Sequence, residues 1–156
     1  MIQKRQIYVS STAWEPKVGY ARMVRVGTQL WISGTTAKCA DGQLVGCDDA
    51  YVQTQQALKN IGAPLKRAGA TFQEVVRTRM YVVNIASDWE PVGRAHGEVF
   101  TNIKPATTMV EVRALIDTHM LVEIEADVII MSRVNRRTQP KRANRSVKTR
   151  RNRACG

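Results

Sequence analysis

The segment Phe72–Ile85 constrains the fold of this chain more than any other. Two sets of its residues alternate, Val76, Thr78, Met80 and Val82 with Arg77, Arg79, Tyr81 and Val83. A period of two is typical of a β-strand with one buried face. Such a strand needs neighbouring strands for its backbone hydrogen bonds and a second layer to cover its apolar face. The sequence therefore predicts a sheet with one covered side.

Four further segments have strand-like patterns. Tyr20–Val26 alternates weakly, and Gln29–Ser33 is predicted to be a buried strand that ends at Gly34. Near the other end of the chain, Thr107–Leu115 and Met120–Met131 follow the same rule. The second of these alternates apolar residues with acidic ones, which favours a strand whose other face is polar.

A long amphipathic helix is expected after the first strands. Asp48 or Asp49 can cap it, because a short carboxylate accepts the unpaired N–H groups of the first turn. Its apolar stripe has near-helical spacing and consists of Val52, Leu58, Ile61, Leu65 and Ala68. Proline inside a helix removes a hydrogen bond and clashes with the preceding turn. We therefore expect a kink or break near Ile61–Pro64 and an end at Gly69.

A second, short helix is predicted after the central strand. Ser87 and Glu90 have the spacing of a capping box, and Pro91 would lie in the first turn, where its missing N–H costs little. The helix is expected to end near Phe100. The order of elements predicts an α+β domain with a single antiparallel-rich mixed sheet and both helices on one face.

The charge of the chain is concentrated at its C-terminal end. The net charge is +11, but residues 1–131 carry 14 Lys and Arg against 13 Asp and Glu, a net charge of +1. Residues 132–156 carry ten Lys and Arg, no acidic residue and almost no large apolar one. Such a segment cannot offset the entropy of ordering itself. We therefore predict one domain over residues 1–131 and a basic flexible tail over residues 132–156.

Several function classes are not expected. No run of about 20 apolar residues is present, and the first residues lack the apolar stretch of a secretory signal, so we expect a cytoplasmic protein without a membrane partner. Cys39, Cys47 and Cys155 are expected to be reduced thiols. His96 and His119 have no ligand spacing for zinc, and neither a metal nor another cofactor is expected.

Several spaced motifs together resemble the Rid (YjgF-like) family, whose members include proteins called L-PSP endoribonucleases. The motifs are Gly19-Tyr20, Ser33-Gly34, Pro105-Ala106, Val110-Glu111-Val112 and Val122-Glu123-Ile124-Glu125-Ala126. The resemblance covers about residues 7–131. It implies a chorismate-mutase-like fold and a homotrimer with small-molecule clefts between subunits. Better-known members of the family hydrolyse reactive enamines and imines, such as 2-aminoacrylate, to the keto acid and ammonia.

The resemblance also implies which residues line each cleft: Tyr20, Ser33, the backbone N–H of Gly34, Thr107, Met109 and Glu123. Glu123 would hold a water or relay its proton as a general base. The Gly34 N–H would face developing negative charge. Other interpretations stay open, since Glu123 could be a plain strand residue, Gly34 a turn and Tyr20 an interface residue.

The chain departs from the family at the position that binds the substrate carboxylate. Thr107 stands where the deaminating members have arginine, and Met109 replaces a cysteine. A threonine hydroxyl offers one donor and no charge, so the loss of a bond worth about 1.5–3 kcal/mol weakens carboxylate binding on the order of 10- to 100-fold. Arg113 could share a strand face with Thr107, but six residues span roughly 20 Å, too far to replace it.

Three functions follow as hypotheses. The first is a hydrolase or deaminase-like enzyme for imines, enamines or related metabolites that is not an efficient 2-aminoacrylate deaminase. The second is a non-catalytic trimer that binds a metabolite or a protein. The third is RNA binding or cleavage aided by residues 132–156, which would be weak and non-specific because no aromatic residue is interleaved for base stacking.

Removal of residues 132–156 tests the third hypothesis. If the basic tail binds phosphates, a chain that ends at Met131 should no longer retain single-stranded RNA in a filter-binding assay at low salt. Retention by the full chain should fall steeply as salt is added, because binding releases counterions. Equal retention by both chains would exclude the tail.

Overall fold

The structure, a computed structural model, describes residues 4–10, 12 and 14–131, and the predicted tail lies outside these residues. The strands are β1 (Arg5–Tyr8), β2 (Met23–Val26), β3 (Gln29–Thr35), β4 (Val75–Val82), β5 (Ala106–Glu111) and β6 (Val122–Ile129). The α-helices are α1 (Trp14–Val18), α2 (Ala50–Arg67) and α3 (Ile85–Phe100).

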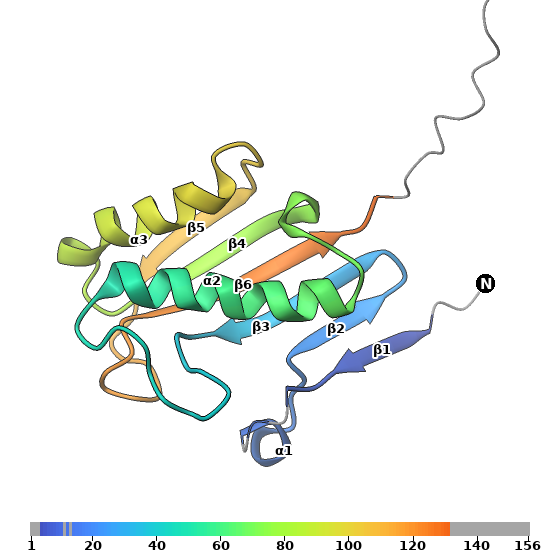
Figure 1. Ribbon diagram of the computed structural model, residues 1–156, viewed down its shortest axis with the longest axis horizontal. Coiled ribbons are helices and arrows are strands. Elements are labelled where there is room, and N and C mark those ends of the chain that lie inside the picture. Colours follow the sequence, from blue (N-terminus) through green and yellow to red (C-terminus); the bar gives the residue numbers. More distant parts are fainter. Residues whose placement is uncertain (1–3, 11, 13, 132–156) are drawn as a thin grey trace, which may run out of the picture.

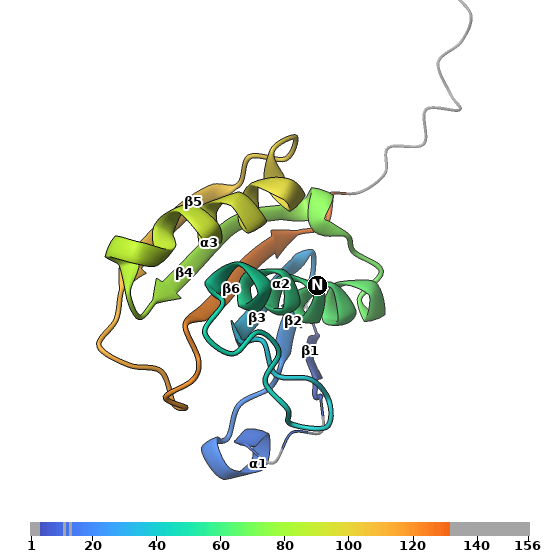
Figure 2. The ribbon, with the colours of Figure 1, turned by 60° about the vertical axis from the view of Figure 1, so that its left-hand side comes forward.

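One mixed sheet forms the body of the fold. Its strand order is β1-β2-β3-β6-β4-β5, and every neighbouring pair is antiparallel except the parallel pair β4 and β5. Helices α2 and α3 lie side by side over one face, whereas the short α1 lies apart from this layer (Figures 1 and 2). The predicted α+β class and antiparallel-rich sheet are confirmed, and α1 is a third helix that the sequence did not indicate.

The central strand β4 keeps the predicted alternation with one correction. Thr78, Met80 and Val82 are buried beneath the helices as expected. Val76 is 42% exposed and Val75 is buried in its place, because the register with β6 shifts between Val75 and Arg77. This irregularity moves one residue to the opposite face of the sheet.

The strand ends also differ from the prediction. The stretch Phe72–Glu74 is a 3-10 turn rather than strand, so β4 is shorter than predicted. Strand β5 stops at Glu111, not at Leu115, since Glu111 pairs with Val82, the last residue of β4. Strand β6 is likewise shorter than predicted at both ends. Gly34 does not end β3, which continues to Thr35.

Helix α2 runs unbroken through Pro64. Asp49 caps it, with its carboxylate accepting from the Val52 N–H at 3.0 Å. Pro64 lies in the last turn, where its missing N–H leaves one carbonyl of the preceding turn without its usual helical partner but does not interrupt the helix, so the predicted break is wrong. The helix ends at Arg67, close to the predicted Gly69, whose φ of +72° is readily adopted by glycine.

Helix α3 begins earlier than predicted, and a residue of strand β5 caps its N-terminus. It starts at Ile85, whose N–H donates to the Glu111 carboxylate at 3.0 Å, and Pro91 lies inside it. The predicted capping box at Ser87 and Glu90 is therefore wrong, and the helix is not short. Its end at Phe100 is as predicted. A carboxylate brought from β5 replaces a local cap, which no local pattern could indicate.

None of these helices combines the length and apolar character needed to cross a lipid bilayer, as far as the structure describes the chain.

Candidate functional site

Glu123 lies on the side of the sheet that the helices leave uncovered. Its neighbours on β6, Val122 and Ile124, are fully buried beneath the helix layer, so the Glu123 side chain points the other way. The carboxyl group is half-buried, yet no donor or cation in the described part of the chain bonds to it. Burial raises the pKa of this carboxyl group, Glu125 raises it further, and Arg22 opposes the rise. A carboxyl group in this condition is a candidate for chemistry.

The Glu123 carboxyl group lies directly against the backbone of Gly34. A Cβ atom at position 34 would lie 2.8 Å from Glu123 Cδ and still closer to Oε1. The register of β3 and β6 shifts between Ile32 and Thr35, so Gly34 sits in an irregular part of the ladder. The irregularity, with glycine in it, is what lets the carboxyl group approach the main chain.

Arg22 joins these residues to Tyr20. Its Nη1 donates to Gly34 O at 2.7 Å and to Thr35 Oγ1 at 3.1 Å, and its Nη2 donates to the Tyr20 hydroxyl at 3.2 Å. We call Tyr20, Arg22, Gly34 and Glu123 the Glu123 cluster. Sequence reasoning missed Arg22, and its one signal was that it stands two residues after Tyr20 in the strand predicted over Tyr20–Val26, where alternate residues share a face.

The Ser33 hydroxyl hydrogen is engaged in a hydrogen bond to the backbone. Ser33 Oγ donates to Ala21 O at 2.7 Å, and the Ser33 N–H donates to Arg22 O at 3.1 Å. These bonds hold the start of β2 against β3. Toward a ligand, the Ser33 oxygen can therefore only accept while this arrangement lasts.

Thr107 and Met109 lie far from the Glu123 cluster within one chain. Both are on the edge strand β5. At usual strand spacing β5 lies roughly 10 Å from β6, which carries Glu123, and roughly 14 Å from β3, which carries Gly34. Thr107 Oγ1 bonds to Thr78 Oγ1 at 3.0 Å, and Thr78 Oγ1 bonds in turn to His96 Nε2 of α3 at 3.0 Å. Both side chains thus belong to the helix-covered side.

The buried end of this hydroxyl chain is a histidine. His96 is 9% exposed, its ring packs on Phe100 with centroids 4.5 Å apart, and burial lowers the pKa of its imidazole. Arg113 is exposed beyond the end of β5. Thr107 lies on the helix-covered side of the sheet and Glu123 on the uncovered side. A cleft that contains both residues therefore needs a second copy of the chain.

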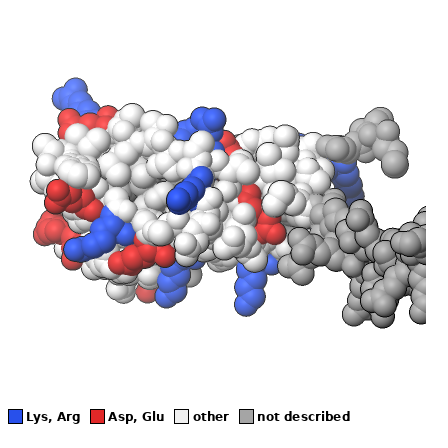
Figure 3. Space-filling model, turned by 90° about the horizontal axis from the view of Figure 1, so that it is seen from above, with Lys and Arg blue, Asp and Glu red and all other residues white. Residues whose placement is uncertain are grey.

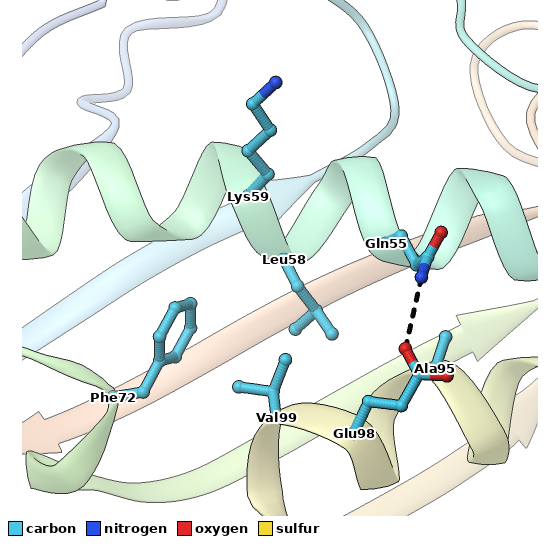
Figure 4. Close-up of a pocket in the computed structure, with 7 residues that line it drawn as sticks. All are labelled: Gln55, Leu58, Lys59, Phe72, Ala95, Glu98 and Val99. Carbon is cyan, nitrogen blue, oxygen red and sulfur yellow. Dashed lines mark hydrogen bonds between the residues drawn. The ribbon is translucent and has the colours of Figure 1, made fainter.

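A separate hollow of about 270 Å³ lies between α2 and α3 (Figure 4). Leu58, Phe72 and Val99 form its apolar floor, and Glu98 accepts from Gln55 Nε2 at 3.1 Å on its rim. It belongs to the helix layer and contains no residue of the Glu123 cluster. Nothing in its lining is typical of a catalytic centre.

On the face of the domain seen from above, the charged side chains are of both signs and are mixed with uncharged surface (Figure 3). Among the residues that the structure describes, no three His, Cys, Asp or Glu side chains are grouped so that they could hold a metal ion.

Comparison with known proteins identifies the family. Residues 10–130 match the family described as Endoribonuclease L-PSP. The chain is 36% identical over 124 residues to the human 2-iminobutanoate/2-iminopropanoate deaminase. The aligned residues make up 78% of this chain and 88% of that protein. A crystal structure from Mycobacterium tuberculosis, of a YjgF family member, has a TM-score of 0.73 and 43% identity, over 81% of this chain and 100% of that one. The chain belongs to the Rid (YjgF) family.

Another Rid structure supports the same assignment. The Rid family protein of Yersinia pestis has a TM-score of 0.71 and 31% identity, over 81% of this chain and 100% of that one. The predicted family and fold are therefore confirmed. In this Rid chain, Glu123 lies directly against Gly34, and Arg22 links Gly34 to Tyr20.

Replacement of Gly34 by alanine tests the contact on which the cluster depends. The new Cβ must push the Glu123 carboxyl group aside, but this group is the end of a flexible side chain, so we expect a loss of only about 1 kcal/mol in the free energy of unfolding. The carbon-13 resonance of the Glu123 carboxyl group should shift clearly.

Gly93→Ala is the matched control, because its Cβ would meet no atom within 4 Å in the interior of α3. It should stabilise the fold by about 0.5–1 kcal/mol and leave the Glu123 resonance in place. An unmoved Glu123 resonance in Gly34→Ala would contradict the close contact.

Proposed function

We propose that this Rid domain is a deaminase-like hydrolase of imines, enamines or related small metabolites, acting in clefts between the subunits of a homotrimer. The observation that carries the proposal is the half-buried Glu123 carboxyl group, which has no hydrogen-bond donor from the described residues and lies against Gly34. A structural carboxylate is normally paired when it is buried. A carboxylate without such a partner is suited to hold a water molecule.

The chemistry needs one water and one base. Glu123 accepts a proton from the water as the water oxygen attacks the C=N carbon. Glu123 then gives this proton to the nitrogen of the carbinolamine, the hydroxyl proton is lost, and the C–N bond breaks to give a carbonyl compound and ammonia. The Tyr20 hydroxyl accepts from Arg22, so its own hydrogen is available to a ligand. The Gly34 N–H would stabilise negative charge on the ligand as it develops.

The human relative supports this reaction class, since it is named as a deaminase of 2-iminobutanoate and 2-iminopropanoate. The uncovered face of the sheet supports association with further copies, because it exposes large apolar side chains, among them Trp31 at 41% and Ile129 at 41%. Thr107 and Met109 of a neighbouring protomer would complete the cleft. With Thr107 in place of arginine, acidic substrates would bind weakly.

Replacement of Glu123 by glutamine separates catalysis from binding. Glutamine keeps the shape but cannot accept a proton, so release of ammonia from a neutral imine, formed in place by an amine oxidase, should fall about 100-fold or more. The exposed Glu90→Gln is the control and should keep full activity. Equal turnover in both variants would show that Glu123 is not the base. A wild-type chain that binds imines without hydrolysing them would support the alternative hypothesis, a non-catalytic binding protein.

Replacement of Thr107 by arginine tests the substrate preference. Wild-type protein should release pyruvate from 2-aminoacrylate only slowly, and Thr107→Arg should raise this rate on the order of 10- to 100-fold, because the new guanidinium can bind the carboxylate bidentately. Asn102→Arg adds the same charge to the exposed loop before β5 and should have no effect. Fast pyruvate release by the wild type would contradict the prediction.

A further inference from the structure

Arg22 occupies the centre of the Glu123 cluster. Its guanidinium holds the Gly34 carbonyl, the Thr35 hydroxyl and the Tyr20 hydroxyl at 2.7, 3.1 and 3.2 Å, and it lies 5.6 Å from the centre of the Tyr20 ring. The Arg22 carbonyl also accepts from the Ser33 N–H. Such a planar fork with several fixed acceptors is rigid compared with a lone surface arginine.

Gly34 lies between the two charged groups. Its carbonyl oxygen accepts from Arg22, while its α-carbon is covered by the Glu123 carboxyl group. The two charges are close enough that Arg22 opposes the rise in the pKa of Glu123, yet no ion pair joins them within the described chain. A ligand or water at Glu123 would therefore not have to displace a guanidinium first.

Other charged groups near Glu123 do not offer this compensation. Glu125, two residues along β6, has the same charge, and Tyr81 pairs with Glu123 from β4. The nearby Arg79 is committed to Glu125 at 3.3 Å and Asp127 at 3.0 Å. Among the residues that the structure describes, Arg22 is thus the cation that acts on Glu123.

We propose that Arg22 is a positioning residue of the hydrolytic site: it fixes the Tyr20 hydroxyl and the Gly34 carbonyl beside Glu123, the carboxylate that takes the proton from water. This inference rests on the proposed function in so far as Glu123 is the base. It adds a requirement that the resemblance did not include, a cation on the same protomer as the carboxylate. Loss of Arg22 would leave the base protonated over more of the pH range.

The direct test is a titration that does not depend on activity. Carbon-13 labelling of glutamate carboxyl groups, with Glu123→Gln to assign the resonance, reports the midpoint of the Glu123 titration. Removing the positive charge in Arg22→Gln should shift this midpoint upward, because an opposite charge favours the ionised form. Arg22→Lys keeps the charge and should shift it less. Arg22→Met gives a second neutral variant if the glutamine variant does not fold.

Arg25→Gln is the matched control. Arg25 is three residues further along and donates to Gly27 O and Ala68 O, on the helix side, so its loss should leave the Glu123 midpoint unchanged. An unchanged midpoint in Arg22→Gln and Arg22→Met would overturn the inference. So would a midpoint that Arg25→Gln moves equally.

The rate against pH separates this inference from the proposed function. With the neutral imine as substrate, Arg22→Gln should move the acidic limb of the kcat profile upward in pH, in the same direction as the titration midpoint. If the midpoint moves but Glu123→Gln retains full turnover, the proposed function fails while the charge relation stands. If the loss in Arg22→Gln is confined to acidic imines and the midpoint is unchanged, Arg22 binds the substrate instead, and the inference is wrong.

Discussion

The close contact between the Glu123 carboxyl group and the main chain at Gly34 is the constraint from which the rest of the site follows. A Cβ atom at position 34 would occupy the space of the carboxyl group, so any residue other than glycine there would push the Glu123 carboxyl group away from the main chain. The irregular ladder between Ile32 and Thr35 creates the space, and the Gly34 carbonyl that it exposes is held by Arg22. A local break in the hydrogen-bond pattern thereby places a carboxylate, a phenol and a guanidinium together.

Within the part of the chain that the structure describes, the charges on the uncovered face leave the Glu123 carboxylate without a bonded partner. Glu123, Glu125 and Asp127 alternate along β6 and lie on the same side of the sheet. Arg79 bonds to the second and third of these, which lowers the repulsion along the strand. Glu123 at the end of the row is left with burial and a like charge, both of which raise its pKa, and with Arg22 as the opposing influence. Stability would favour a paired carboxylate here, and the lack of one is a reason to assign Glu123 a functional role.

The protomer separates the two halves of the proposed cleft. One half is the Glu123 cluster on β3, β6 and the segment that leads into β2. The other is the edge strand β5, where Thr107 is linked through Thr78 to the buried His96. Because β4 lies between β5 and β6, and Thr107 and Glu123 are on opposite faces of the sheet, the two halves do not meet within one chain. A neutral hydroxyl chain at β5, in place of a cation, is consistent with a preference for uncharged substrates.

The sequence by itself determined the elements that depend on local periodicity. The alternation in β4 and β6 and the stripe of α2 specified strand, strand and helix, and the spaced motifs specified the family. It could not determine where those elements stop, since Glu111 caps α3 from another strand and Pro64 is tolerated inside α2. The tertiary structure alone decided that Arg22 meets Gly34 and that Thr107 lies apart from Glu123. Both depend on strand order and on a shift in register, which are contacts between residues distant along the chain and leave no periodic trace in it.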